Sequence, residues 1–307
     1  MTDIIVIGAG CAGLSAAIYA ARAGKSVLVL EQEAVGGQIA SSPRVENYPG
    51  IPAISGLEFS DRLLAQAEAL GVELDYVRAT GLRPGRTMAV LTEDGEKSCK
   101  SVVLAAGAKH RALGLPRERE LAGRGVGYCA VCDGAFYKGR DVAVVGGGSA
   151  ALQSAEYLAA ICRSVTLIHR RNEFRGEAAL AARAAALPNV RLELESVVTA
   201  LLGEPELTGV TVKNRASGAE KQLAVAGLFI AAGQTPDTAA FETAVRLDES
   251  GYVLASEDCA TSAPGVFAAG DCRRKPVRQL TTAAADGAVA ALAACAWADR
   301  AAEGEAR

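Results

Sequence analysis

Two cysteines separated by two residues, Cys129 and Cys132, are the side chains of this sequence best spaced to do chemistry together. The Cys-x-x-Cys spacing lets the two sulfurs join, and the motif itself can lower the pKa of one thiol toward neutrality. Asp133 follows directly. A carboxylic acid beside such a pair can protonate a leaving thiolate or take the proton from an attacking thiol, provided that its surroundings raise its pKa. The pattern predicts a redox couple with its own acid/base, although Asp133 could equally serve as a helix cap.

A metal site is the other chemistry that a close cysteine pair can do. Zinc would need two more ligands, usually a second close pair. The only histidines are His110 and His169, and the remaining cysteines are scattered singly: Cys11, Cys99, Cys162, Cys259, Cys272 and Cys295. The sequence therefore predicts no metal site. In a large intracellular chain, one close pair indicates a redox couple and not a disulfide framework.

A glycine-rich loop near the N-terminus has the spacing of a dinucleotide site. Gly8, Gly10 and Gly13 follow an apolar strand and open a helix. The first glycine permits a tight turn, the second lets the backbone approach a pyrophosphate, and the third lets the helix pack on the strand. Glu31 ends the second strand 18 residues after Gly13. An acid there accepts hydrogen bonds from a ribose, so this loop favours a dinucleotide without a 2′-phosphate.

A second loop of the same kind carries a basic strand end. Gly146, Gly148, Ser149 and Ala150 repeat the strand–loop–helix arrangement 138 residues after the first loop. The second strand here ends in His169, Arg170 and Arg171, and Arg175 follows. Guanidinium groups at that position suit the 2′-phosphate of NADP(H), because their planar fork grips phosphate through two hydrogen bonds. A solvated basic turn is the alternative. Together the loops predict FAD as a held cofactor and NADPH as a diffusing reductant.

The elements that must position these residues alternate between strands and helices twice. Around the loops, strands are predicted at 3–8, 26–31, 141–145 and 165–169, and helices at 10–24 and 149–161. A further amphipathic helix is predicted at 55–71, and an alanine-rich one at 280–298. This internal duplication predicts an α/β fold of two Rossmann-like FAD/NAD(P)-binding domains in three-layer ββα form, the second inserted into the first.

The last stretch of the chain has no glycine-rich loop of its own, so it must complete one of the two domains. We expect the first domain to comprise 1–113 and 241–307, and the second, which carries the cysteine pair, to comprise 114–240. The polar tail 299–307 is expected to fray beyond the last helix.

The net charge and its distribution along the chain indicate which kinds of partner the protein would not bind. The net charge is −3 without a block of like charges, which predicts neither nucleic-acid nor membrane binding. The uncharged stretch 4–21 could pass for a targeting segment, but Asp3 precedes it where basic residues would be needed, and it contains the first glycine loop. A cytoplasmic location follows as the default.

Five motifs in order resemble the low-molecular-mass, bacterial-type thioredoxin reductases. They are Cys129–Gly134, Gly146–Gly148, His169–Arg171, Arg175 and Phe267–Asp271. The resemblance spans nearly the whole chain. It implies NADPH-dependent reduction of a thioredoxin or thioredoxin-like protein by a homodimer, in which the NADPH domain swivels relative to the FAD domain. Two chain crossings between domains are the natural hinge for such motion.

The resemblance also implies roles for individual residues. Cys132 would face the flavin, Cys129 would attack the partner disulfide, and Asp133 would act as acid/base. The residues implied to lie along FAD, in addition to the glycine loop and Glu31, are Gly36, Gly37, Gln38, Asn47, Gly107, Gly270, Asp271, Arg278, Gln279 and Leu280. Two alternatives stay open: a dithiol oxidase or reductase of another small protein disulfide on the same scaffold, and a flavoprotein with a purely binding or sensory role.

Overall fold

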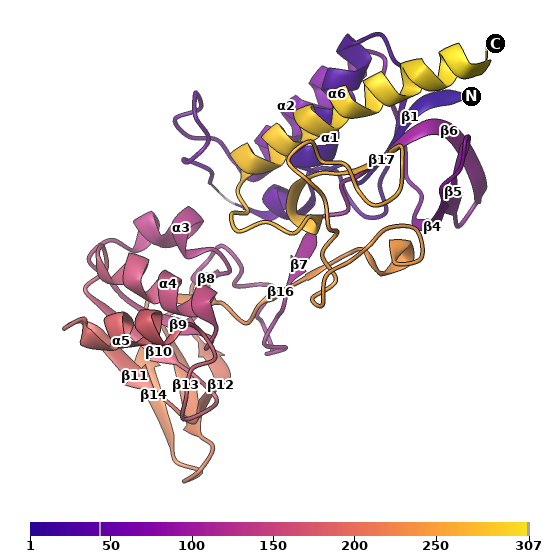
Figure 1. The fold of residues 1–307 in the computed structure, drawn as a ribbon. Coiled ribbons are helices and arrows are strands. Elements are labelled where there is room, and N and C mark those ends of the chain that lie inside the picture. The colour runs from indigo at the N-terminus through magenta and orange to yellow at the C-terminus, as the bar shows by residue number, and fades with distance from the viewer. Residues whose placement is uncertain (43, 306–307) are drawn as a thin grey trace. The chain divides into compact units, whose positions relative to one another are not determined.

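The computed structural model describes residues 1–42 and 44–305, and the chain divides into two compact units (Figure 1). Unit 1 comprises Met1–Lys109 and Thr235–Arg307, and unit 2 comprises His110–Gln234. Each is an α/β unit built on a sheet with a parallel core, and the second is inserted into the first. The predicted fold of two Rossmann-like domains is confirmed.

Unit 1 is built on a seven-stranded sheet in which β3, β2, β1, β6, β5 and β4 follow one another and β17 also pairs with β6. β1, β2, β3, β6 and β17 are parallel, whereas β4 and β5 form an antiparallel extension. The strands are β1 (Thr2–Ile7), β2 (Val27–Leu30), β3 (Glu73–Asp75), β4 (Ala79–Arg83), β5 (Met88–Thr92), β6 (Gly95–Leu104) and β17 (Val266–Ala268). Because β17 comes from the last stretch of chain, that stretch completes the first unit.

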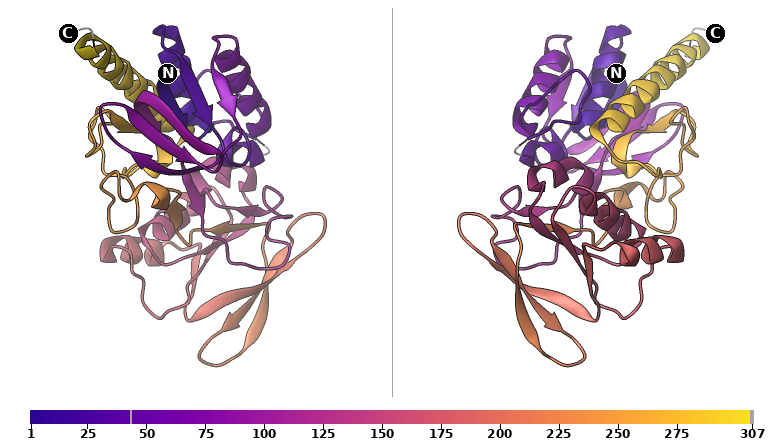
Figure 2. Two further views of the ribbon diagram at one scale, coloured as in Figure 1. Left: turned by 90° about the vertical axis from the view of Figure 1, so that its right-hand side faces the viewer. Right: turned by 90° about the vertical axis from the view of Figure 1, so that its left-hand side faces the viewer.

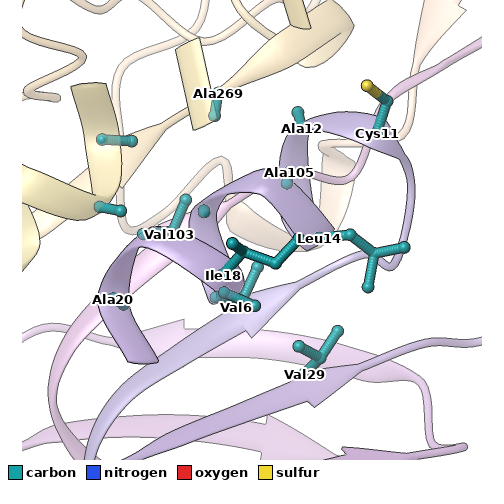
Figure 3. Packing of buried hydrophobic residues seen from close by; sticks show 14 of the residues in the cluster. Val6, Cys11, Ala12, Leu14, Ile18, Ala20, Val29, Val103, Ala105 and Ala269 are labelled. Carbon is teal, nitrogen blue, oxygen red and sulfur yellow. The ribbon is translucent and has the colours of Figure 1, made fainter. Parts of the chain in front are cut away.

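The helices of unit 1 cover this sheet with small apolar side chains. They are α1 (Cys11–Arg22), α2 (Gly56–Glu68) and α6 (Leu280–Glu305), with short 3-10 turns η1 (Gly37–Ser41), η3 (Ala239–Phe241) and η4 (Gly270–Cys272). Figure 3 shows Leu14 and Ile18 of α1 lying toward Val6 and Val29 of the strands below. The α2 helix begins at a true cap, because the Ser55 hydroxyl accepts a hydrogen bond from the Glu58 amide at 3.1 Å.

The last helix, α6, extends further than expected. It continues to Glu305, so the prediction that the tail frays from residue 299 is wrong for the described residues. Two of its described residues, Ala301 and Ala302, are of the strongest helix-forming type, and Asp299 forms an ion pair with Lys25. The segment Leu280–Arg300 is long and apolar enough to span a membrane by length and composition alone. Here it packs on α1, where Gly287 lies against the backbone of Ala12.

Unit 2 repeats the arrangement around a five-stranded parallel sheet of order β11-β10-β9-β15-β8. Its strands are β8 (Val126–Gly127), β9 (Asp141–Val145), β10 (Ser164–Ile168), β11 (Val190–Glu193) and β15 (Gly227–Ile230), and its helices are α3 (Ala130–Asp133), α4 (Ser149–Ala159) and α5 (Ala178–Ala186), with the turn η2 (Gly134–Tyr137). A separate antiparallel sheet consists of β12 (Ser196–Leu202), β13 (Gly209–Asn214) and β14 (Glu220–Ala224). Figure 2 shows its long hairpins in salmon and orange.

The two places where the chain crosses between units pair with each other. β7 (Ala108–His110) and β16 (Gln234–Pro236) form a two-stranded ladder. The structure thus places the crossings at 109/110 and 234/235, four and six residues before the expected boundaries at 113/114 and 240/241. The residues after His110 contact unit 2, since the Arg111 amide bonds to the Gly233 carbonyl.

Candidate active site

Backbone contacts and hydrogen bonds to Glu31 fix the conformation of the first glycine loop. Gly8 adopts a φ of 106°, which favours glycine, and a Cβ on Gly13 would collide with the Gly8 carbonyl oxygen. Glu31 is buried, and its carboxylate accepts hydrogen bonds from the Ala9 and Glu33 amides at 2.8 Å each. Each carboxylate oxygen keeps further lone-pair capacity. The loop, the start of α1 and this acid therefore form one cradle.

Two further glycines extend the same cradle. Gly36 donates its amide hydrogen to the Ala9 carbonyl and pairs with Gly10 through an isolated bridge. Gly36 and Gly37 both have positive φ, at 95° and 59°. The Gln38 side chain bonds to the carbonyl of Ala108. These contacts join Gly36 to the glycine loop and Gln38 to β7.

Asp271 lies in unit 1 with a buried oxygen that lacks a partner. Its Oδ1 makes no hydrogen bond within the described residues, and burial raises the pKa of the carboxyl. A buried polar atom without a partner is costly, so such an atom in a site of this kind calls for a hydrogen-bond donor from a ligand. Hydroxyl groups of a ribityl chain fit that requirement. The structure therefore has the polar chemistry that a flavin dinucleotide would need.

The remaining predicted residues of unit 1 come together from separate stretches. The Asn47 amide donates to the Gln279 side-chain oxygen at 3.2 Å, and the Leu280 carbonyl accepts from the Cys11 thiol at 3.5 Å. The Arg278 guanidinium lies over the Tyr252 ring at 4.1 Å and donates to the Asp271 carbonyl. Gly107, with φ of 68°, accepts a hydrogen bond from the Asp237 amide. All lie in unit 1.

The turn after β10 packs against the second glycine loop. Gly146 has a φ of 156°, and its amide donates a hydrogen bond to the Ile168 carbonyl. The amides of Arg175 and Gly176 both donate to the Gly147 carbonyl, at 2.7 and 3.1 Å. Gly148 is the N-cap of α4, and Ser149 and Ala150 form its first turn. The turn thus brings Arg175 to the glycine loop.

His169 and the arginines around it lie in different environments. Arg170, Arg171 and Arg175 are exposed. His169 is buried, its ring packs on Gly147 and stacks with Phe174 at 5.3 Å, and burial lowers its pKa. The three guanidinium groups are free to reach a phosphate, whereas the imidazole lies inside the turn and supports it.

The cysteine pair forms a disulfide at the start of α3 in unit 2. The Cα atoms of Cys129 and Cys132 are 5.3 Å apart. Cys129 caps the helix, because its sulfur accepts a hydrogen bond from the Cys132 amide at 3.2 Å. The side chains are partly exposed, and Val131 between them is exposed. An incoming disulfide can therefore reach this turn.

Asp133 ends the same helix in a confined position. Its Oδ2 lies against Gly127, and burial, followed by the charge of Asp133, raises the pKa of Tyr137. Burial raises the pKa of Asp133 from 3.8 to about 6. That value is close enough to neutrality for the carboxyl to exchange protons with a thiol during turnover. Cys129 is the N-cap of α3, whereas Asp133 stands at the N-cap of the next turn, η2 (Gly134–Tyr137), and makes no side-chain capping hydrogen bond there.

No group of three or more His, Cys, Asp and Glu side chains in residues 1–42 and 44–305 is arranged to hold a metal ion. The disulfide and two dinucleotide-type loops therefore define the chemistry of the described chain. Residues 2–288 match the family model of the pyridine nucleotide-disulphide oxidoreductases. The chain belongs to this family.

Relatives of this oxidoreductase chain are similar over nearly its full length. The thioredoxin reductase of Treponema pallidum (strain Nichols) is 40% identical over 299 residues, which cover 97% of each chain. The bifunctional thioredoxin reductase/thioredoxin of Mycobacterium leprae (strain TN) is 41% identical over 300 residues, or 96% of this chain and 65% of that protein. The crystal structure of thioredoxin reductase from Streptococcus pyogenes MGAS5005 has a TM-score of 0.94 at 39% identity and covers 98% of this chain and 99% of that chain.

One residue of this oxidoreductase that sequence reasoning missed is Asp286. Its Oδ2 accepts hydrogen bonds from the Gly270 amide at 3.0 Å and from Lys275 at 2.7 Å, and its Oδ1 lies 3.6 Å from Arg273. It thereby fixes the turn that carries Asp271. The available signal was a single acid within the otherwise uncharged stretch 280–298.

Proposed function

We propose that this chain is an NADPH-dependent thioredoxin-disulfide reductase that holds FAD in unit 1 and binds NADPH in unit 2. The observation that supports this most is the Cys129–Cys132 disulfide next to Asp133, whose pKa burial raises to about 6, in a chain with two dinucleotide loops. The purified protein should be yellow and should reduce thioredoxin with NADPH. A colourless protein that cannot be reconstituted with FAD would overturn the proposal.

The residues of unit 1 fit FAD. Bound FAD supplies a two-electron relay between NADPH and the disulfide. Glu31 would accept hydrogen bonds from the adenosine ribose, the start of α1 would face the pyrophosphate, and Asp271 would accept from the ribityl chain. The supporting residues are those of the cradle: Gly8, Gly10, Gly13, Gly36, Gly37, Gln38, Asn47, Gly107, Gly270, Arg278, Gln279 and Leu280.

Gly13→Ala is expected to abolish FAD retention. The added methyl would collide with the Gly8 carbonyl oxygen, which forces α1 away from β1. Flavin absorbance per protein after gel filtration measures the effect, and we expect it to fall at least about tenfold, since displacement of the loop by even about 1 Å is costly. Gly148→Ala is the control for flavin retention, because Gly148 lies in the loop of unit 2, has an extended backbone and leaves an added Cβ with nothing within 4 Å. A fully yellow Gly13→Ala protein would contradict the assigned loop.

The thiol chemistry follows from the order of the two sulfurs. In the reduced enzyme, the Cys129 thiolate attacks one sulfur of the partner disulfide, which forms a mixed disulfide and releases one partner thiolate to be protonated. Cys132 then gives its proton to Asp133 and attacks the Cys129 sulfur. This closes the enzyme disulfide and releases the second partner thiol. The partner gains two electrons and two protons: the electrons come from the enzyme pair, one proton comes from Cys132 through Asp133, and the other comes from solvent, which took it when Cys129 ionised.

NADPH would bind to unit 2 through Gly146, Gly148, Ser149 and Ala150, with the 2′-phosphate at the arginines. Arg170→Ala combined with Arg171→Ala is expected to raise the KM for NADPH about 10- to 100-fold and to leave the KM for NADH nearly unchanged. A charged hydrogen bond is worth roughly 1.5–3 kcal/mol when it is shielded from solvent, and each contributes less at exposed positions such as these, so the two together are expected to give about 1.4–2.8 kcal/mol. Steady-state kinetics with both nucleotides measure this. Equal losses with NADPH and NADH would show that the arginines do not read the 2′-phosphate.

The finer points of assembly are also proposals. A thioredoxin or thioredoxin-like protein is the partner, which fits a partly exposed disulfide turn.

We propose a homodimer. Apolar surface is exposed on unit 1 at Tyr19 of α1 and at Val289 and Leu292 of α6. A cytoplasmic location fits six buried free thiols, which reducing compartments preserve. The ladder of β7 and β16 would be the hinge that lets the disulfide meet its reductant and its partner in turn.

A further inference from the structure

Glu118 is a buried carboxylate that lies between the first crossing and the cysteine pair. Only 3% of the residue is exposed. Its Oε1 accepts a hydrogen bond from the Leu113 amide at 3.0 Å, and its Oε2 accepts from the Gly114 and Leu115 amides at 2.8 and 3.2 Å. Three consecutive backbone amides just after the first crossing are thus fixed by one side chain.

A fourth donor connects this carboxylate to the residue before Cys129. The Tyr128 hydroxyl donates to Glu118 Oε1 at 2.9 Å. Burial, followed by the hydrogen bond to Glu118, raises the pKa of Tyr128 to about 12, so the hydroxyl keeps its proton and remains a donor. The three amides would already hold the segment 113–115 in place. The additional bond to Tyr128 serves the cysteine segment.

The other face of Tyr128 contacts the crossing itself. Its ring stacks on His110 with centroids 5.1 Å apart and planes inclined by 16°. The Nδ1 of His110 lies 3.2 Å from the Gln234 side-chain amide, and burial lowers the pKa of His110, which favours the neutral ring that can accept this bond. His110 belongs to β7 and Gln234 to β16. On one side Tyr128 therefore packs on His110, which Gln234 of the other crossing strand holds in turn, and on the other side it bonds to Glu118.

A fixed Tyr128 fixes the geometry of the pair. Cys129 follows it directly, its sulfur accepts from the Cys132 amide, and its carbonyl accepts from the Asp133 amide at 3.1 Å. We propose that Glu118, Tyr128 and His110 are positioning residues that hold the Cys129–Cys132 turn rigidly to the two crossing strands. This inference rests on the proposed disulfide reductase function. Displacement of a reacting group by about 1 Å can cost about 100-fold in rate, so a turn held from both sides keeps its sulfurs aligned.

Tyr128→Phe tests the link while it keeps the ring stack on His110. We expect kcat/KM for thioredoxin to fall about tenfold, while the KM for NADPH and the rate at which NADPH bleaches the flavin stay within about twofold. Hydrogen exchange, which does not depend on turnover, should become faster in the peptide 126–134. Tyr76→Phe, which removes the hydroxyl of an exposed tyrosine in unit 1, is the control and should change neither measurement.

Glu118→Gln provides the second arm, because an amide offers two donors where the carboxylate accepts four hydrogen bonds. If both residues act through the one hydrogen bond between them, their effects should not add. The double variant Glu118→Gln/Tyr128→Phe should then turn over thioredoxin less than twofold more slowly than Glu118→Gln alone. Tyr128→Phe with wild-type turnover and wild-type exchange overturns the positioning role, and so does a uniform loss that includes flavin bleaching. If the wild-type enzyme does not reduce thioredoxin, the proposed function is refuted and the positioning role is not. Faster hydrogen exchange in Tyr128→Phe would then still show that the Glu118–Tyr128 bond holds the cysteine turn.

Discussion

Cys132→Ser is expected to bind FAD and NADPH normally and to lose NADPH-dependent thioredoxin reduction by at least about a thousandfold. Serine cannot form the disulfide with Cys129, so the pair has no oxidised state and the mixed disulfide with the partner has no sulfur to resolve it. Loss of a covalent nucleophile can cost about 10⁶-fold. A thioredoxin-coupled disulfide assay measures the loss, and flavin absorbance confirms retention of the cofactor.

The variant should also trap its partner. Cys129 remains a nucleophile in Cys132→Ser, and a mixed disulfide formed with thioredoxin stays intact because no neighbouring thiol attacks it. Non-reducing electrophoresis should show a band at the summed mass. Cys162→Ala is the matched control, since Cys162 is a buried free cysteine of the same unit with a pKa raised to about 11 by burial. Full activity in Cys132→Ser would refute the sulfur relay.

The features that could be predicted from the sequence are those whose physical cause is local. The loop at 8–13 requires a tight turn and a close approach of helix and strand. Both requirements are met by the three glycines at positions 8, 10 and 13, so the sequence alone indicates them. The same holds for the Cys-x-x-Cys turn, where the two sulfurs are three residues apart. The β–α–β units around each loop were therefore predicted within a few residues, as in β9, which coincides with the predicted strand at 141–145.

The features that could not be predicted depend on side chains that meet across the fold. Asp286 reaches Gly270 from another element, and Glu118 reaches Tyr128 across ten residues of irregular chain. Neither position has a spacing that indicates its partner. His169 was grouped with the arginines because it is adjacent to them in sequence. His169, however, directly follows the buried strand β10, and its ring packs against Gly147 while the next two side chains face solvent. This burial depends on the turn after β10 packing on the second glycine loop, a contact between separate segments that the strand pattern does not indicate.

The division between the units depends on the same kind of contact. The first crossing was expected near Leu113, and the compact units divide between Lys109 and His110. The pairing of β7 with β16 is a contact between segments more than 120 residues apart, and it ends the first stretch of unit 1 earlier. The end of α6 was missed for a related reason, because the ion pair of Asp299 with Lys25 joins distant parts of unit 1.

Asp133→Asn is expected to lower thioredoxin turnover about 10²- to 10⁴-fold, the usual range for loss of a general acid–base. An amide keeps the shape of the side chain and cannot take the proton of Cys132. In the wild type, Asp133 titrates near pH 6 because burial raises its pKa. Turnover limited by the thiol step should therefore fall as pH drops through about 6, and this limb should be missing in the variant. Asp61→Asn, an exposed position on α2, is the control.

Stability provides an independent check on the same carboxyl. Its pKa in the folded protein, about 6, lies above the unfolded value near 3.8, so folding favours the protonated form. The raised pKa of Asp133 makes its full contribution to the free energy of unfolding below about pH 4, and this contribution is lost as the pH rises through 6. Asp133→Asn carries no such charge, so its stability relative to wild type should increase between pH 4 and 6 and level off above. Thermal unfolding across this range measures the difference. A pH-independent difference, together with an unchanged acid limb in turnover, would mean that Asp133 is ionised throughout and that the proton of Cys132 goes elsewhere.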